Sequence, residues 1–475
     1  MQQAKRWEFF ALGGLLLLAL VLRVVGLNAP LWYDEILTLT HFVREPWAKL
    51  LTDFSSLNNH MLYSIEAKIS VGLLGESAWA FRLPAMLLGV ASLFILWLLA
   101  RKPAGAIPAL VAVFLTAVSY HHVWFSQNAR GYTQLLFLTG LATWLFLRGM
   151  ERPTWRIWTA YGVTIAACMY THLSAGFFLA SHGVVAAVML LRDWRGFRPV
   201  YGFALGGVIT VLLHLPLFSQ VISAMNDVSK GKTSAAMAEW VNPLRMLREV
   251  IDSLGALGPL APLALTGGLL VIVVGAVTLC RRAPVLSAIY LLSIPIAMAI
   301  LLALSFRIWT RYFLVDILYI FLFIAVGLDV LSQWFARTIS LPGLGRPLYI
   351  LAIVVAAGAS AVLLVRNYEH PKQDFEGAIQ LINKLKSPND ATTSFGLASE
   401  PFNTYLEPRW PVVKSYADLT KLRKDASHVW VVTAFDDHVE EYQTATMDEI
   451  RRTYDLVGEF DGTLGGGTVR VYRSR

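Results

Sequence analysis

The sequence contains little charge for its length. Asp, Glu, Lys and Arg make up 15% of its 475 residues, whereas soluble domains have about 25% charged residues. Hydrophobic residues make up 56%, against roughly 45–50% in soluble domains. A fold surrounded by water on all sides is therefore excluded, and most of the chain must lie in lipid.

Cysteine is nearly absent as well. Cys168 and Cys280 are far apart in the sequence, and each lies within an apolar run. Two such residues support neither a disulfide framework nor a zinc cluster. We interpret both as small apolar side chains.

The positive net charge of +8 does not indicate a nucleic-acid partner. Residues 367–475 hold 13 Lys and Arg against 17 Asp and Glu, so the basic excess belongs entirely to residues 1–366. There the basic residues stand in short connections between apolar runs, not in one continuous patch. We therefore expect the chain to bind no nucleic acid.

Long apolar runs dominate residues 1–366. A membrane-spanning helix needs about 20 mostly apolar residues, and eleven runs qualify, of which the pair within 157–191 is the least clear. The first run follows Lys5 and Arg6 as a signal peptide would, but it is long and lacks a clear cleavage site, so we interpret it as an uncleaved span. The eleven runs are 9–27, 80–100, 106–125, 132–148, 157–172, 174–191, 201–222, 256–280, 284–305, 312–334 and 347–365.

Clusters of Lys and Arg recur in every second connection between these runs, as the positive-inside rule requires of a chain whose N-terminus is cytoplasmic. The clusters are Arg101 and Lys102; Arg148, Arg152 and Arg156; Arg192, Arg195 and Arg198; Arg281 and Arg282; and Arg337 and Arg346. This count places 28–79, 126–131, 223–255, 306–311 and the tail from Asn367 on the outer side. We expect a multi-pass protein of the cytoplasmic (inner) membrane with a periplasmic or extracellular tail.

The tail, residues 367–475, has the pattern of a small soluble domain. An amphipathic stretch from Asp374 to Lys386 precedes three short β-rich runs, Ala391–Gly396, His428–Ala434 and Thr468–Tyr472. Such an order of elements predicts an α/β domain. The run Gly465-Gly466-Gly467 has no following Lys and helix, so it predicts a hairpin turn and not a phosphate loop. The fold class is thus a polytopic α-helical membrane domain, 1–366, followed by an outer α/β domain.

An acidic pair, Asp34-Glu35, directly follows the first span and opens the outer segment 28–79. Carboxylates there lie within reach of a lipid head group. Acidic residues are also common in the first turn of a helix, so the pair could serve only as a cap. What favours a chemical role is the set of polar residues expected on the same side, notably His60, Arg130, Tyr132, Arg307, Arg311 and Tyr312.

The arginines of the short outer connections are unexpected, because the positive-inside rule favours Lys and Arg on the cytoplasmic side. A guanidinium presents a planar fork that suits phosphate oxygens, so an anionic lipid phosphate would explain them. The alternative for each is snorkelling at the membrane interface or pairing with a nearby acid. His121 and His122 could be taken for metal ligands, but adjacent residues on a helix point about 100° apart and rarely share one metal.

The order of these motifs resembles the membrane-embedded C-type (GT-C) glycosyltransferases, specifically the branch of protein O-mannosyltransferases and lipid A aminoarabinose transferases. The resemblance covers nearly the whole chain. The motifs that carry it are Asp34-Glu35, Asn58-Asn59-His60-Met61-Leu62-Tyr63, Gly75-Glu76-Ser77-Ala78-Trp79-Ala80-Phe81-Arg82-Leu83-Pro84, Ala129-Arg130-Gly131-Tyr132, Thr310-Arg311-Tyr312-Phe313 and Gln373-Asp374-Phe375. The second differs from the commoner His-Pro-Pro-Leu-Tyr form because it has neither proline.

The resemblance implies a transferase that takes a sugar from a polyprenyl phosphate and gives it to a hydroxyl of a glycan, lipid or protein. By likeness, Asp34 is the acidic residue that acts at the acceptor, Glu35 completes the pair, and Arg130 holds the donor phosphate. We expect Asp34 to accept the proton, Arg311 and His60 to help bind the leaving phosphate, and the anomeric carbon to invert. Tyr132, Arg307 and Tyr312 are expected to line the same donor site.

No cofactor is firmly implied, and no metal ligands are assigned. A divalent cation can join a carboxylate to a lipid phosphate, but the motifs do not demand one. Three alternatives stay open: a flippase for lipid-linked sugars, a scaffold with degenerate motifs, and a transferase of whole oligosaccharides. The large connections on one side and the lack of an obvious internal repeat favour a one-sided enzyme over a transporter.

Overall fold

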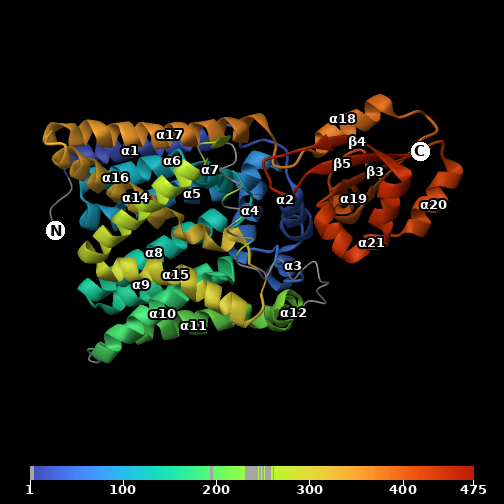
Figure 1. The fold of residues 1–475 in the computed structure, drawn as a ribbon. Helices are drawn as coiled ribbons and strands as arrows, with labels where there is room; N and C mark the ends of the chain where they lie inside the picture. Colours follow the sequence, from blue (N-terminus) through green and yellow to red (C-terminus); the bar gives the residue numbers. More distant parts are fainter. Residues whose placement is uncertain are drawn as a thin grey trace.

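The structure of the chain is a computed structural model that describes residues 5–192, 196–229, 244, 248, 251, 258, 259, 261–306 and 308–475. It consists of a bundle of long helices and a small α/β domain at one end of that bundle (Figure 1). The N-terminus lies at the opposite end of the bundle from this domain.

Each of the eleven apolar runs coincides with a helix or a broken helix of the bundle. These helices are α1 (Arg6–Val24), α5 (Ala78–Ala104), α6 (Ala106–Ala117), α7 (Tyr120–Ser126), α8 (Tyr132–Glu151), α9 (Trp155–Thr171), α10 (Ala175–Arg192), α11 (Arg198–His214), η2 (Leu215–Leu217), α12 (Phe218–Ser229), α14 (Ala261–Arg282), α15 (Pro284–Ala303), α16 (Ile317–Thr338), η6 (Pro342–Leu344) and α17 (Gly345–Glu369).

Within the described residues, eight helices are long and apolar enough to cross a membrane. A ninth span results if α6 and α7, which meet at 60°, are taken together. The remaining two, α8 and α9, are not among them, so the number of eleven spans stays a prediction. Both nevertheless pack inside the bundle, where Phe146 of α8 and Trp158 of α9 are fully buried.

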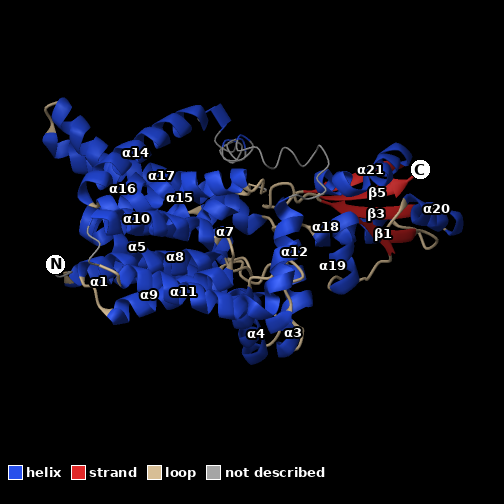
Figure 2. Ribbon diagram, turned by 90° about the horizontal axis from the view of Figure 1, so that it is seen from below, coloured by secondary structure: helices blue, strands red, loops and turns tan. Residues whose placement is uncertain are grey.

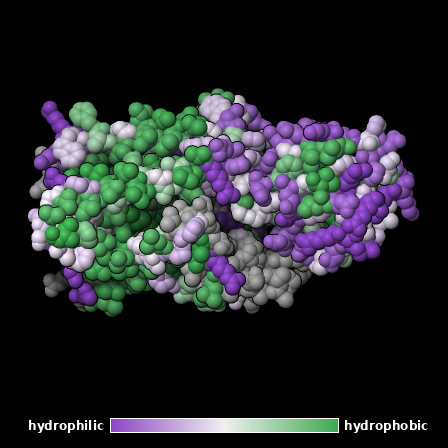
Figure 3. Space-filling model, turned by 45° about the horizontal axis from the view of Figure 1, so that its top comes forward, coloured by the Kyte–Doolittle hydropathy of each residue, from purple (hydrophilic) through white to green (hydrophobic). Residues whose placement is uncertain are grey.

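Apolar side chains cover the outside of the bundle. Leu17, Val211, Leu263 and Ile350 are among the many large aliphatic residues that are exposed there. Figure 3 shows the resulting contrast between a mostly hydrophobic bundle and a mostly hydrophilic C-terminal domain. An apolar outer surface of this extent is explained by lipid as the surrounding solvent, and the chain is a multi-pass membrane protein.

The basic connections meet at the N-terminal end of the bundle. Arg101, at the end of α5, donates to Glu8 of α1 at 2.7 and 2.9 Å. Lys102 and Arg148 both pair with Glu151 at the end of α8. Arg101, Lys102 and Arg148, which belong to two of the clusters that the sequence predicts to be cytoplasmic, therefore lie together, at the end away from the C-terminal domain.

The end of the bundle that faces the C-terminal domain carries short helices (Figures 1 and 2). Between α1 and α5 lie α2 (Tyr33–Thr38), η1 (Leu39–Val43), α3 (Trp47–Thr52) and α4 (Met61–Leu74). The 3-10 segment η5 (Thr310–Asp316) leads into α16. These elements correspond to the predicted outer segments 28–79 and 306–311.

The C-terminal domain is the predicted α/β unit. Its elements are α18 (Phe375–Leu385), β1 (Ala391–Phe395), η7 (Gly396–Ala398), α19 (Ser399–Thr404), β2 (Val412–Val413), α20 (Tyr416–Asp425), β3 (Val429–Ala434), α21 (Asp436–Thr453), β4 (Tyr454–Phe460) and β5 (Val469–Ser474). The strand order is β2-β1-β3-β5-β4, in which β2, β1 and β3 are parallel and β5 and β4 are antiparallel to their neighbours.

Alternate residues of the central strand β3 enter two different cores, as the two-residue period of a strand requires. Trp430 and Val432 pack on the side of α18, and Val429 and Val431 pack on the side of α21. The three predicted β-rich runs are strands β1, β3 and β5. Gly465 to Gly467 lie between the antiparallel strands β4 and β5, so the predicted hairpin turn is confirmed.

Candidate functional site

The acidic pair occupies the first turn of helix α2. The chain leaves α1 through Gly26, whose φ of 76° favours glycine, and enters α2 at Tyr33 with extended backbone at Trp32. Asp34 and Glu35 are therefore the second and third residues of a helix, where acidic side chains are favoured. The two acids therefore do lie in the first turn of a helix, as the capping alternative requires. Their side chains, however, have different partners.

Asp34 lies between two arginines that are far away in the sequence. Its Oδ2 atom is 3.4 Å from Nη1 of Arg130 and 3.9 Å from Nη1 of Arg311. The three side chains come from α2, from the connection between α7 and α8, and from η5. The Asp34 side chain is 17% exposed, Arg130 3% and Arg311 33%, so the cluster is open on the Arg311 side.

Arg130 is held by polar neighbours but is not saturated by them. Its Nη1 donates to Oδ1 of Asn58 and its Nη2 lies 3.1 Å from Nε2 of His60. Its Nε is buried and has no hydrogen-bond partner among the described residues. The guanidinium also lies 5.8 Å from the centre of the Tyr132 ring. Arg130 therefore has a buried donor for which the described part of the chain supplies no acceptor.

His60 presents a second donor to the same place. Its Nδ1 accepts the backbone N–H of Gly131 at 2.8 Å, so a neutral ring carries its proton on Nε2. Burial, and then the charges of Arg130 and Arg311 with the neighbouring His172, hold the pKa of His60 well below its usual value, and the ring is neutral. A guanidinium can only donate, so the Nε2–H of His60 and the Nη2–H groups of Arg130 are donors that face each other. A shared anionic oxygen would satisfy both.

Aromatic rings surround this cluster on the bundle side. The Tyr132 ring centre is 5.0 Å from that of His60 and 5.8 Å from that of His172, and the His172 ring is 6.1 Å from that of Tyr312. Two of the predicted site residues thus adjoin the cluster, Tyr132 by direct contact with His60 and Arg130 and Tyr312 through His172. Arg307, the remaining predicted residue, lies outside the described residues.

Glu35 has a different environment from Asp34. Its two oxygens accept from Nε and Nη2 of Arg82 at 2.8 and 2.6 Å, and both side chains are completely buried. Glu35 also accepts the backbone N–H groups of Ala129 and Trp32. Burial by itself would raise the pKa of Glu35, but the Arg82 charge and these bonds leave the pKa lowered. Protein donors thus occupy the acceptor sites of Glu35, which favours a structural role for it, and its part in a reactive pair stays a prediction.

Arg82 and Glu35 together fasten the first outer segment. The guanidinium of Arg82 additionally donates to the backbone carbonyls of Leu27, Ala29 and Pro30. Because Glu35 binds the amide of Ala129, the pair also fixes the connection that carries Arg130. Arg82 therefore has an anchoring role in this part of the structure.

Asn58 is the site residue that sequence reasoning left without a role. Its Nδ2 donates to the backbone oxygen of Asp34 at 2.9 Å and to Oγ1 of Thr38 at 3.1 Å, while its Oδ1 accepts from Arg130. One amide therefore ties α2 to the arginine. Its position two residues before His60, in a motif already singled out, was the only available signal.

The C-terminal domain meets this end of the bundle through several specific contacts. The buried Lys372 donates to the backbone oxygen of Gln127 at 2.6 Å, and burial lowers its pKa to about 7. Gln373 accepts the backbone N–H of Tyr33 at 2.9 Å. His41 of η1 pairs with Glu400 of α19 at 2.7 Å on the exposed rim.

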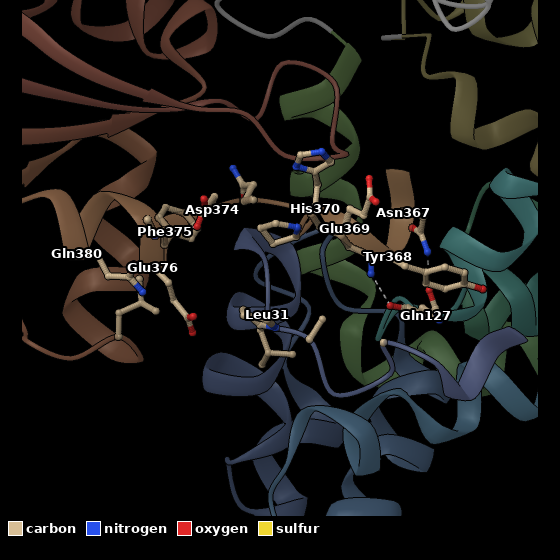
Figure 4. A pocket seen from close by; sticks show the side chains of 18 of the residues that line it. Leu31, Gln127, Asn367, Tyr368, Glu369, His370, Asp374, Phe375, Glu376 and Gln380 are labelled. Atoms are coloured by element: carbon tan, nitrogen blue, oxygen red, sulfur yellow. Dashed lines mark hydrogen bonds between the residues drawn. The ribbon is translucent and has the colours of Figure 1, made fainter. Parts of the chain in front are cut away.

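A pocket of about 400 Å³ lies at this junction. Figure 4 shows Tyr368 and Asn367 near Gln127 on one side of it, and Glu376 and Gln380 of α18 on the other. Its lining includes neither Asp34 nor Arg130, so it is separate from the arginine cluster. Among the described residues, no group of three or more His, Cys, Asp or Glu side chains is placed to hold a metal ion.

The chain is similar to one protein family in sequence and to several solved structures in fold. The family model for dolichyl-phosphate-mannose-protein mannosyltransferase matches residues 61–219, a range that begins just after His60 and includes Arg130. No curated protein sequence matches the chain.

Solved structures are similar over nearly the whole chain. ArnT from Cupriavidus metallidurans bound to undecaprenyl phosphate has a TM-score of 0.57 at 14% identity, covering 99% of this chain and 98% of its own. The oligosaccharyltransferase AglB from Archaeoglobus fulgidus, in complex with an inhibitory peptide and a dolichol-phosphate, has a TM-score of 0.55 at 11% identity, covering 98% of this chain and 74% of its own.

The fold and the polar cluster define a multi-pass membrane protein with its candidate chemistry at one end of the bundle. More particularly, the chain has the fold of the GT-C glycosyltransferases, because ArnT and AglB share its architecture over almost its full length. Together with the mannosyltransferase family match, this confirms the resemblance inferred from the motifs.

Proposed function

We propose that the chain transfers a sugar from a polyprenyl phosphate carrier to an acceptor hydroxyl. The observation that carries this proposal is the position of the Asp34 carboxylate, 3.4 and 3.9 Å from the guanidiniums of Arg130 and Arg311. A base beside two cations is the equipment that transfer from a sugar phosphate ester requires. The sugar is already activated, so no further cofactor is needed for the step.

In the proposed step, the acceptor oxygen attacks the anomeric carbon while its proton passes to Asp34. The bond between that carbon and the phosphate oxygen breaks, and its electron pair leaves with the phosphate. The lipid phosphate changes from a diester to a monoester and gains negative charge. A single displacement of this kind inverts the anomeric configuration.

The growing charge on the phosphate would be met by Arg130, Arg311 and His60. Arg130 contributes its Nε, which has no partner in the described part of the chain, and the neutral His60 contributes its Nε2–H. These donors are oriented before substrate arrives, because Asn58 and the Gly131 amide hold them, and pre-oriented donors are the most effective kind. Tyr132 and Tyr312 would line the same donor site, and we assign Arg307 there by the motif alone.

The polyprenyl nature of the donor is supported by the relatives. ArnT was solved with undecaprenyl phosphate and AglB with a dolichol-phosphate, and the matching family acts with dolichyl phosphate mannose by its description. We propose that the protein lies in the cytoplasmic membrane. The positive-inside pattern favours an orientation with the N-terminus inside, and with the C-terminal domain and the cluster of Asp34, Arg130 and Arg311 outside. The acceptor is a glycan, a lipid or a protein.

The flippase alternative is not favoured. A transporter needs a site reached from both sides of the membrane, whereas Asp34, Arg130 and Arg311 gather at the end of the bundle beside the C-terminal domain. The matching family is described as a mannosyltransferase, and AglB, which has a similar fold, as an oligosaccharyltransferase.

The test is donor turnover by the purified full-length protein. Radiolabelled polyprenyl phosphate esters of several hexoses and pentoses are incubated with the protein and with membranes that carry candidate acceptors. We expect one ester to be consumed with release of an equal amount of polyprenyl phosphate, and the product to have the inverted anomeric configuration by NMR. Movement of a donor across a liposome membrane without its consumption would instead support the flippase.

A further inference from the structure

The N-terminus of helix α2 is completed by a residue of the C-terminal domain. The first N–H groups of a helix have no partner within that helix. The N–H of Trp32 is accepted by Glu35 from the first turn itself. The next one, of Tyr33, is accepted by Oε1 of Gln373, which lies 340 residues away in the sequence.

Gln373 is well placed to act as a fixed cap. It is almost completely buried, and its Nε2 donates to the backbone oxygen of Gly467 at 3.0 Å. Both ends of one side-chain amide are therefore engaged, one by α2 and the other by the turn between β4 and β5. Movement of that turn would be transmitted to the first residue of α2.

A second contact from the same domain holds the side chain of Tyr33. The ring of Phe435 lies 5.5 Å from the Tyr33 ring in an edge-on arrangement. Phe435 follows the carboxyl end of β3 and has a left-handed backbone, with φ 58° and ψ 46°. This conformation is uncommon for bulky residues. With it, the Phe435 ring contacts Tyr33 of the bundle.

We propose that Gln373 is a positioning residue for Asp34, so that the C-terminal domain sets the carboxylate against Arg130 and Arg311. Tyr33 and Asp34 are consecutive, and the backbone oxygen of Asp34 is held from the other side by Asn58. The backbone that carries the Asp34 carboxylate is thus held from the bundle and from the C-terminal domain at once. This inference rests on the proposed function for its catalytic consequence, but the cap itself can be tested without any substrate.

Two variants of the full-length protein separate the cap from a general structural effect. Both variants lose the Nε2 donor to Gly467. Gln373→Met keeps the length of the side chain and also removes the acceptor, whereas Gln373→Glu keeps an oxygen for the Tyr33 N–H. Glu400→Gln is the matched control, because it removes the charge of the exposed pair with His41 between the same two parts of the chain and leaves the hydrogen bond to the Tyr33 N–H in place.

The first measurement is hydrogen exchange of the segment 32–38 by mass spectrometry. We expect faster exchange in Gln373→Met and exchange close to that of the unaltered protein in Gln373→Glu and Glu400→Gln. Unchanged exchange in Gln373→Met would overturn the inference whatever the activity.

The second measurement is steady-state turnover of the donor found in the panel. A displacement of about 1 Å at a reacting group can cost 10²-fold in rate, so we expect Gln373→Met to lower kcat about 10- to 100-fold with the donor KM little changed. Gln373→Glu should recover most of this loss. An unchanged kcat in Gln373→Met, or an equal loss in Glu400→Gln, would overturn the positioning role. If the unaltered protein consumes no donor at all, the proposed function fails, while the exchange experiment still decides on the cap.

Discussion

Asp34 and Glu35 are neighbours in the sequence and have opposite environments. Asp34 is partly exposed and lies 3.4 and 3.9 Å from two guanidiniums that it does not fully engage. Glu35 is completely buried and receives two short bonds from one guanidinium. Two carboxylates in contrasting environments commonly have separate roles. The contrast suggests that the first is kept available for chemistry and the second is used to build the site.

The largest expected effect that sharpens this contrast is that of Asp34→Asn. The change keeps the shape of the side chain and removes its ability to accept a proton. Loss of a general base typically costs about 10²–10⁴-fold in rate, so donor turnover should fall by that order. The thermal unfolding midpoint should change little, because Asp34 makes no short side-chain bond. Full turnover by this variant would remove Asp34 from the mechanism.

Glu35→Ala should do the reverse and act first on stability. Removing one partner of a buried ion pair leaves the other charge without compensation, at a typical cost of about 3–5 kcal/mol. We expect a large drop in the unfolding midpoint in detergent and a poor yield of folded protein. The double variant Glu35→Leu with Arg82→Met should recover only part of this, because Arg82 also serves three backbone carbonyls. A Glu35→Ala protein of normal stability would contradict the structural role.

Arg130→Ala tests the cationic side of the Asp34 cluster. Removal of one well-placed donor to a developing anion typically costs about 10²–10³-fold in rate, and we expect a loss of that order in kcat with normal insertion and purification. Arg44→Ala is a suitable control, since Arg44 lies in the segment 28–79 at the same end of the bundle but pairs with Glu76 on the surface. Equal activity of the two variants would exclude Arg130 from phosphate binding.

The sequence could predict most of the bundle, because membrane spans are specified by composition and length, and loop charge gives their direction. It could not decide the number of spans, since α8 and α9 are packed inside the bundle and do not need a lipid-facing composition. In the C-terminal domain, β1, β3 and β5 were predictable from their apolar β-rich runs. The other two strands were missed: β2 has only two residues, and β4 lies at the sheet edge with Asp455 and Glu459 among its residues.

The candidate site was predictable in its residue types but not in its pairings. The motifs pointed to Asp34, Arg130 and Arg311, which the fold brings together from three separate segments. The sequence joined Glu35 to Asp34 because they are adjacent, although successive residues on a helix point about 100° apart. That rule, which argued against a shared metal for His121 and His122, also separates the two acids. The link from Gln373 to Tyr33 had no sequence signal, because nothing local indicates a contact across 340 residues.

The smallest expected effect concerns pH and returns to the two acids. The lowered pKa of Glu35 in the folded protein means that its pair with Arg82 contributes stability above pH 4.5, the ordinary value. This contribution is lost as the pH falls below 4.5 through the folded pKa, because the unfolded chain then binds the proton more readily than the folded one. In Glu35→Gln this part of the acid dependence is absent. Its unfolding midpoint should therefore start lower at neutral pH and fall less steeply than that of the unaltered protein as the pH is lowered below 4.5. In Asp34→Asn the unfolding midpoint should depend on pH as steeply as in the unaltered protein. If the midpoint depends on pH equally in all three proteins, the charge of Glu35 does not stabilise the fold.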